Sequence, residues 1–167
     1  MRKVEPIRDT DDIERMKDYL KSKNERDYVM MVTGLYSGMR VSDILPLKVR
    51  SVKGTHIEVT ERKTGKTKRF AINPALRKAL DHYIKENELK DYDYLFPSRK
   101  KVSNEGVGLT NIGTHSMRKT FGYHHYRKNQ NVGILMELFN HSSPDITLGY
   151  IGFKQDELDN SMLNFAY

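Results

Sequence analysis

Six side chains of this sequence have the types and the placement to act together on a phosphate ester. They are Arg40, Lys63, His115, Arg118, His141 and Tyr150. They stand next to glycines, turns or helix caps, and His115 and Arg118, three residues apart, share one face of a helix. Two guanidiniums, two imidazoles, one amine and one phenol, without metal or acid, are the groups that a phosphodiester transesterification needs.

The physical basis of this interpretation is the charge that develops during the reaction. Cleavage of a phosphodiester passes through a five-coordinate state whose non-bridging oxygens carry extra negative charge. The planar fork of an arginine meets two such oxygens at once, and preorganised donors usually supply the largest share of a rate enhancement. A tyrosine nucleophile keeps the energy of the broken bond in a phosphotyrosyl ester, so rejoining needs no ATP.

Other chemistries fit the sequence less well. Gly65-Lys66-Thr67 resembles the end of a nucleotide-binding phosphate loop, but Thr60 stands where that loop needs glycine, and strands are expected on both sides. The six histidines lack metal-ligand spacing, since His124 and His125 point about 100° apart on a helix. The chain has no cysteine, which excludes thiolate nucleophiles and thiolate metal sites. We therefore expect neither a metal nor a cofactor.

The elements that must position these residues are mostly helices, because apolar residues recur at helical spacing between capping residues, glycines and prolines. Helices are predicted over residues 10–22, 26–37, 41–45, 74–87, 115–128, 132–139, 144–150 and 156–165. The period changes to two at residues 56–60 and 67–72, which with a turn at 64–66 predicts a β-hairpin with lysines at its tip. Residues 94–96 are interpreted as a short buried segment and residues 98–114 as a polar loop.

The length and the charge fit one basic domain. The chain has 167 residues, with 29 Lys and Arg against 22 Asp and Glu, and a formal charge of +7. Such an excess suits DNA or RNA as a partner, although many small basic domains carry it only for solubility. No apolar run approaches the roughly 20 residues of a membrane span, and the start does not resemble a secretory signal, so we expect a cytoplasmic protein without a membrane partner. The predicted fold class is mainly α (α+β), a helical domain with a small antiparallel hairpin.

Five segments, in order, resemble the successive motifs of the tyrosine recombinase (phage integrase) family. They are GMRVSDIL at 38–45, KTG at 63–65, HSMRKTF at 115–121, NHSS at 140–143 and TLGY at 147–150. The resemblance covers about residues 9–165 and implies the fold of the family's catalytic domain. It also implies a site-specific recombinase or integrase that cuts and rejoins double-stranded DNA through a 3′-phosphotyrosine.

The resemblance implies roles for the cationic residues. Arg40 and Arg118 would clamp the scissile phosphate. Lys63 would protonate the leaving 5′ oxygen, with Lys66 and Lys68 as plausible substitutes in the same hairpin.

It also implies roles for the remaining candidates. His115 would accept a proton or bind the phosphate, His141 would hydrogen-bond the phosphate, and Tyr150 would attack it. Asp43, one helical turn after Arg40, matches the family's acidic supporting position. Asn140 stands where the family usually has glycine, a change that the geometry of a helix end tolerates.

The resemblance further implies how the chain is organised and assembled. We expect residues 1–167 to be a single catalytic domain without the family's N-terminal core-binding domain. Residues 98–114 are shorter and more polar than the helix that the family normally places before the first histidine motif. On DNA we expect a homo-oligomer, a tetramer, in which the segment after Tyr150 packs on a neighbouring subunit in a cyclic exchange.

Two other functions stay open. The chain could be a DNA-binding accessory module of the same fold that is catalytically weak or has lost catalysis, or an enzyme that relaxes DNA as a topoisomerase does. The target DNA sequence is not encoded in any motif, because base contacts depend on side-chain placement in the grooves.

Overall fold

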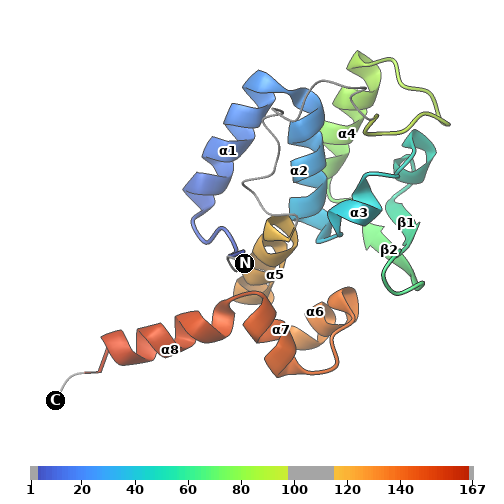
Figure 1. Ribbon diagram of the computed structural model, residues 1–167. Coiled ribbons are helices and arrows are strands. Elements are labelled where there is room, and N and C mark those ends of the chain that lie inside the picture. The colour runs from blue at the N-terminus through green and yellow to red at the C-terminus, as the bar shows by residue number, and fades with distance from the viewer. Residues whose placement is uncertain (1–3, 98–114, 166–167) are drawn as a thin grey trace.

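Eight α-helices and one two-stranded hairpin form the described part of the chain, residues 4–97 and 115–165 of a computed structural model (Figure 1). In chain order the elements are α1 (Thr10–Lys23), α2 (Glu25–Ser37), α3 (Val41–Ile44), the 3₁₀ helix η1 (Val49–Val52), β1 (His56–Thr60), β2 (Thr67–Ala71), α4 (Pro74–Glu86), α5 (Ser116–Asn129), α6 (Val132–Phe139), α7 (Pro144–Tyr150) and α8 (Phe153–Leu163). The predicted fold class is confirmed. The predicted loop at 98–114 lies outside the described residues.

Local capping explains where most of these helices begin and end. Five of them begin at a side chain that accepts a hydrogen bond from a backbone N–H of the first turn, namely Asp9, Asn24, Asn73, Asn131 and Ser143. Helix α2 ends at Gly38 and α6 ends at Asn140, both in the left-handed conformation with φ of 67° and 56°. Both ends were predicted from the sequence, and they direct the chain into the segments of Arg40 and His141.

The apolar core has a larger and a smaller part, and a third cluster, of Leu20, Met31 and Met117, lies at the contact of α2 with α5. The larger part lies among α2, α4, η1 and the hairpin and includes Val29, Ile57 and Leu80. The smaller part lies under α5, α6 and α7 around Phe139. The two helices approach closely at Gly34, where an added Cβ would lie 2.8 Å from Met117 Sδ. This approach brings the end of α2 close to the start of α5.

The hairpin is antiparallel, with Ile57 opposite Phe70 and Thr60 opposite Thr67. Its turn is closed by two backbone hydrogen bonds, from Glu61 N–H to Lys66 O at 2.9 Å and from Gly65 N–H to Glu61 O at 2.8 Å. The hairpin therefore has a defined tip, which lies next to α6 in Figure 1.

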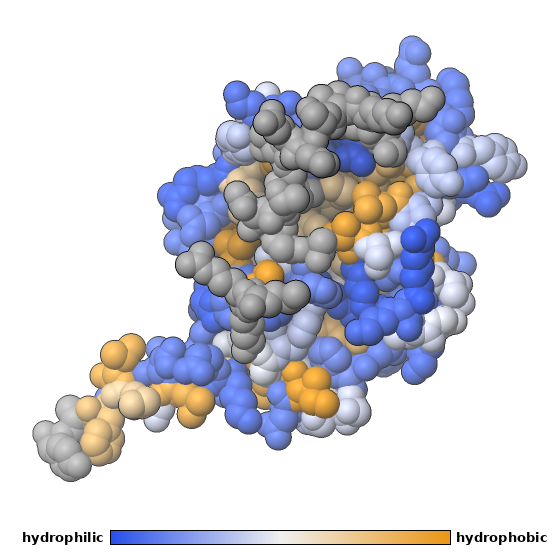
Figure 2. Space-filling view, in the orientation of Figure 1, coloured by the Kyte–Doolittle hydropathy of each residue, from blue (hydrophilic) through white to orange (hydrophobic). Residues whose placement is uncertain are grey.

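Helix α8 points away from the rest of the molecule (Figure 1), and the structure buries none of its residues. Its first turn is anchored, because Phe153 packs edge-on against Tyr126 with ring centroids 4.7 Å apart, and Arg8 pairs with Asp156 at 2.8 Å. Further along, four apolar side chains are more than half exposed, as the hydrophobic colours of this arm in Figure 2 show: Leu158, Met162, Leu163 and Phe165. An apolar surface of this kind is typical of a protein contact.

Three predictions at the level of elements differ from the structure. Helix α8 starts at Phe153 rather than at residue 156, because the aromatic contact of Phe153 is tertiary. Helix η1 was not predicted. Tyr94 is 55% exposed, and only Leu95 and Phe96 of the predicted buried segment are buried. Across residues 4–97 and 115–165, no helix is both long and apolar enough to span a membrane.

Candidate active site

The six candidate residues come from five places in the fold. Arg40 precedes α3, Lys63 lies in the hairpin turn, and His115 and Arg118 stand at the start of α5. His141 lies between α6 and α7, and Tyr150 ends α7. The charges of Arg40 and Arg118 act on the pKa of Tyr150 and of both histidines, so the fold brings these groups within electrostatic reach of one another.

Arg118 is 2% exposed and is held from three sides. Its Nη1 donates to the carbonyl oxygen of Gly38 at 2.6 Å and its Nη2 to that of Leu138 at 3.4 Å, while the guanidinium stacks 4.2 Å above the ring of Phe139. Burial, followed by the charge of Arg40, lowers the pKa of Arg118 to about 10. The side chain therefore stays charged at neutral pH in a fixed orientation, since the ends of two helices supply its partners.

Arg40 is held by two buried carboxylates. Its Nη1 lies 2.7 Å from Glu61 Oε1 and 3.8 Å from Asp43 Oδ2, and both acids are 1% exposed. Asp43 also accepts a hydrogen bond from the backbone N–H of Arg62 at 3.0 Å. Asp43 therefore links α3 to the hairpin beside Arg40.

Glu61, a buried acid that the sequence motifs did not single out, contacts Arg40 and the residue before His141. Its Oε2 accepts from Thr64 Oγ1 at 2.8 Å and from Asn140 Nδ2 at 2.7 Å. The alternation of residues along β1 could have indicated that Glu61 is buried. Ile57 is fully buried, Val59 partly buried, and Glu61, the next residue of the same face, is buried too. A carboxylate on a buried face needs a cation or hydrogen-bond donors.

The two histidines are both shifted toward their neutral forms. Burial, and then nearby cations of which Arg118 acts most strongly, lowers the pKa of His115 and of His141 below the ordinary 6.5. His115 Nδ1 lies 3.4 Å from the phenol oxygen of Tyr150. His141 Nδ1 is hydrogen-bonded to Thr147 Oγ1 at 3.1 Å, which fixes the ring. Neutral imidazoles can accept a proton or donate a hydrogen bond at neutral pH.

Tyr150 is packed by aromatic rings on the inner side of α7. Its ring meets His141 edge-on at 5.1 Å between centroids and Phe139 at 5.6 Å, and the Lys119 ammonium lies 5.1 Å from its centre. Burial raises the pKa of the Tyr150 phenol, although Arg118 and Arg40 both act to lower it. The phenol is therefore protonated at neutral pH, and it must lose its proton to act as a nucleophile.

The three lysines of the hairpin differ in their surroundings. Lys63 and Lys66 are exposed, and the charge of Lys63 lowers the pKa of both His115 and His141. Lys68 is partly buried, donates to the carbonyl oxygen of Glu137 at the end of α6, and has a lowered pKa because of burial. Lys68 therefore docks the hairpin on α6, while the Lys63 ammonium makes no such contact with residues 4–97 or 115–165 and lies within electrostatic range of the histidines.

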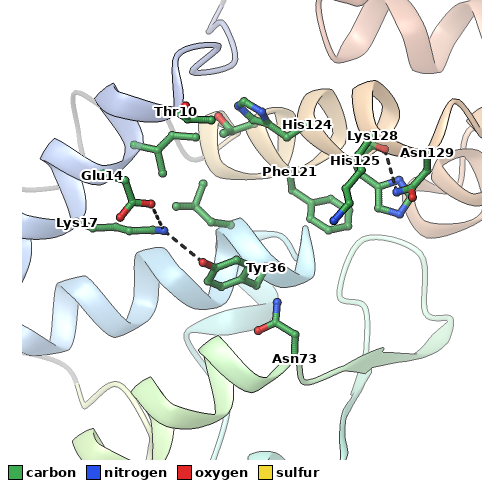
Figure 3. Close-up of a pocket in the computed structure, with 13 residues that line it drawn as sticks. Thr10, Glu14, Lys17, Tyr36, Asn73, Phe121, His124, His125, Lys128 and Asn129 are labelled. Carbon is green, nitrogen blue, oxygen red and sulfur yellow. Dashed lines mark hydrogen bonds and ion pairs between the residues drawn. The ribbon is translucent and has the colours of Figure 1, made fainter.

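A separate cavity of about 530 Å³ lies between α1, α2 and α5 (Figure 3). Lys17 bonds Glu14 and Tyr36 on one side of it, and His124 and His125 face it from α5. None of the six candidate residues lines this cavity. Among the described residues, no group of three or more His, Cys, Asp or Glu side chains could hold a metal ion.

Comparison with known proteins shows which family the chain resembles. Residues 8–156 match the model of the phage integrase family. The probable integrase/recombinase YoeC of Bacillus subtilis is 40% identical over 168 residues, which covers 92% of this chain and 92% of that protein.

Solved structures agree in fold. The crystal structure of XerA recombinase superimposes with a TM-score of 0.71 at 22% identity and covers 98% of this chain and 67% of that one. The catalytic domain of bacteriophage HP1 integrase gives 0.65 at 20% identity, covering 96% and 95% of the two chains. XerH recombinase bound to its palindromic difH substrate gives 0.68 at 16% identity, covering 96% of this chain and 53% of that one.

Proposed function

This chain belongs to the phage integrase family, and from that premise we propose that it is a site-specific DNA recombinase that cuts and rejoins double-stranded DNA through a 3′-phosphotyrosyl bond at Tyr150. The observation that carries the proposal is the surroundings of the Tyr150 phenol. A neutral imidazole lies at hydrogen-bond distance from it, and two guanidiniums act on its charge.

The proposed cleavage step needs only these side chains. The phenol oxygen of Tyr150 forms a bond to phosphorus while its proton passes to Nδ1 of His115, and the bond from phosphorus to the 5′ oxygen breaks. Arg40 and Arg118 bind the non-bridging oxygens, where negative charge grows. Lys63 gives a proton to the leaving 5′ oxygen, and the reverse sequence rejoins the strand without ATP.

Electrostatics support a phosphate as the ligand of this site. Arg40 and Arg118 face two buried carboxylates, and Lys63 acts on both histidines as a third cation, so the charged groups of the site leave an excess of positive charge before DNA arrives. His141 is oriented by Thr147, and its other ring nitrogen can donate a hydrogen bond to a phosphate oxygen when that nitrogen carries a proton. A phosphodiester then adds a negative charge in a setting where arginine donors are already fixed.

The partners that we propose are double-stranded DNA and further copies of the chain. The formal charge of +7 suits a DNA backbone, and the structural neighbour XerH is bound to a DNA substrate. The exposed apolar side of α8 suits packing on a neighbouring subunit within a tetramer on DNA. We place the reaction in the cytoplasm, where the DNA of bacteria such as the source of YoeC lies.

The test is covalent capture on nicked DNA. Wild-type chain and Tyr150→Phe are incubated with a library of nicked duplexes whose sequence around the nick is randomised, and the DNA that stays attached to denatured protein is sequenced. A wild-type adduct that is lost in Tyr150→Phe is expected, and its sequence defines the cleavage site. DNA retardation without an adduct would instead identify a binding module. Relaxation of supercoiled DNA without recombinant products would identify a topoisomerase-like enzyme.

A further inference from the structure

The carboxylate of Glu61 joins three segments that carry candidate residues. One oxygen pairs with Arg40 at 2.7 Å, and the other accepts hydrogen bonds from Thr64 in the hairpin turn and from Asn140 between α6 and α7. Because Glu61 is 1% exposed, its carboxylate is stabilised by these partners rather than by water. Removal of one partner should therefore change the position of Glu61 and of the segments that its other partners belong to.

The backbone of Asn140 shows why its amide matters. The residue has φ of 56°, a left-handed conformation that glycine adopts without strain and that other residues adopt at a cost. An asparagine at this position contributes an amide that glycine lacks, and the nitrogen of this amide donates a hydrogen bond to Glu61 at 2.7 Å. The bond crosses 79 residues of sequence, so it joins elements that are not otherwise neighbours in the chain.

The same bond restrains the turn that contains Lys63. Lys63 lies between Glu61 and Thr64, which hydrogen-bond to each other through their side chains, and the turn is closed again by the Gly65 N–H bond to the Glu61 carbonyl. On the other side, Asn140 directly precedes His141. The bridge from Glu61 to Asn140, together with the contact of Lys68 with the Glu137 carbonyl, therefore holds the turn that contains Lys63 against the segment of His141.

We propose that Glu61 and Asn140 are positioning residues that hold Lys63 where it can protonate the leaving 5′ oxygen. This inference rests on the proposed function and adds two residues to it. In the step concerned, the phenol oxygen of Tyr150 bonds to phosphorus and gives its proton to His115. The bond between phosphorus and the 5′ oxygen breaks, and the 5′ oxygen takes a proton from the Lys63 ammonium.

Asn140→Gly is the most selective variant, because glycine suits the left-handed backbone while the Glu61–Arg40 pair and the Thr64 bond stay in place. Glu61→Gln is the second variant, because a glutamine amide has one acceptor oxygen and a donor NH₂, whereas both carboxylate oxygens of Glu61 face donors. Glu58→Gln is the matched control. Glu58 lies on β1, the strand that ends just before Glu61, and pairs with Arg69, but its side chain is 63% exposed.

The first measurement needs no DNA. Amide hydrogen exchange is followed in the hairpin turn of the free protein, at Gly65 and Lys66. We expect faster exchange in Asn140→Gly and Glu61→Gln than in wild type and in Glu58→Gln, because the turn loses its own anchor on the α6–α7 segment and only the Lys68 contact of β2 with Glu137 remains. Unchanged exchange in Asn140→Gly would overturn the proposal whether or not the chain cleaves DNA.

The second measurement separates protonation of the leaving group from other functions of the site. Adduct formation is compared on the duplex recovered with the wild-type chain and on the same duplex with sulfur in place of the bridging 5′ oxygen, because a thiolate leaves without a proton donor. We expect Asn140→Gly to slow cleavage of the oxygen ester by about tenfold or more and that of the sulfur ester far less. Equal slowing on both duplexes, or no slowing, would overturn the positioning function. Failure of the wild-type chain on both duplexes would overturn the proposed function itself.

Discussion

The phenol oxygen of Tyr150 lies 3.4 Å from Nδ1 of His115, and the pKa values of the two groups move in opposite directions. Burial raises the pKa of the phenol, which keeps its proton. Burial and the charge of Arg118 lower the pKa of His115, which leaves the imidazole free to accept that proton. A nucleophile and its proton acceptor are thus placed side by side with the charge states that an attack on phosphorus requires.

The first prediction concerns the pH dependence of cleavage. The pKa of His115 lies below 6.5, so the neutral form persists until the pH falls through that lowered value. The single-turnover rate of adduct formation should therefore be level near neutral pH and should decline only below pH 6.5. His115→Gln should lower the rate and remove the acidic decline, while His141→Gln should keep it. A decline centred above pH 6.5, or one that persists in His115→Gln, would contradict this assignment.

A second prediction concerns Arg118 and its two carbonyl partners. Lysine cannot reproduce the fork that bonds Gly38 and Leu138, and a buried ammonium tends to lose its proton. Arg118→Lys should reduce the rate of adduct formation by roughly 10²–10³-fold. Retardation of the same duplex should change much less. Arg127→Lys, an exposed arginine on the same helix, is the control and should leave the rate unchanged. Near wild-type cleavage by Arg118→Lys would show that the guanidinium does not bind the reacting phosphate.

Gly38 offers a test of how the fold supports the site. Its φ is +67°, and an added Cβ would lie 2.4 Å from Cδ1 of Phe121. Gly38→Ala should lower the free energy of unfolding by about 1–3 kcal/mol, because it adds backbone strain and overpacking. It should also reduce cleavage, since the carbonyl of Gly38 holds Arg118. Urea denaturation measures the first effect. In the control Gly54→Ala, the nearest contact would be at 4.0 Å, and equal destabilisation of the two variants would refute the account.

Helix α8 leads to a prediction about assembly. Replacement of Leu158, Met162 and Leu163 by glutamine removes most of the apolar surface of the projecting arm, while the anchors Phe153 and Asp156 remain. The triple variant should still form the Tyr150 adduct on a single nicked site. It should fail to produce oligomers on DNA and recombinant products. Native gel mobility and a recombination assay measure both, with Ile134→Gln, 45% exposed on α6, as the control. Normal oligomers of the triple variant would exclude α8 as the contact.

The sequence predicted the helices best where capping is local. Helices α6 and α7 have the predicted bounds, because Asn131 and Ser143 cap their first turns and Asn140 ends α6. The start of α8 could not be predicted in this way, because it depends on the packing of Phe153 against Tyr126, a residue of α5. Local patterns therefore define elements, while contacts between distant elements adjust where they begin.

The candidate site was predicted residue by residue but not as a network. Motifs single out Arg40 and Tyr150, whereas Glu61 follows the end of a strand and belongs to no motif. Its importance comes from burial and from bonds to Arg40 and Asn140, which a single sequence does not specify. Which of the hairpin lysines is available to act on DNA likewise depends on tertiary contacts, because Lys68 donates to the carbonyl of Glu137.

The most direct test of the central claim is the chemical identity of the protein–DNA bond. The trapped wild-type adduct is digested with protease and nuclease, and the peptide that carries nucleotide is sequenced by tandem mass spectrometry. The account predicts a 3′-phosphate ester on the phenol of Tyr150, and no such peptide from Tyr150→Phe. A nucleotide attached to another residue, or joined through a 5′ phosphate, would contradict it.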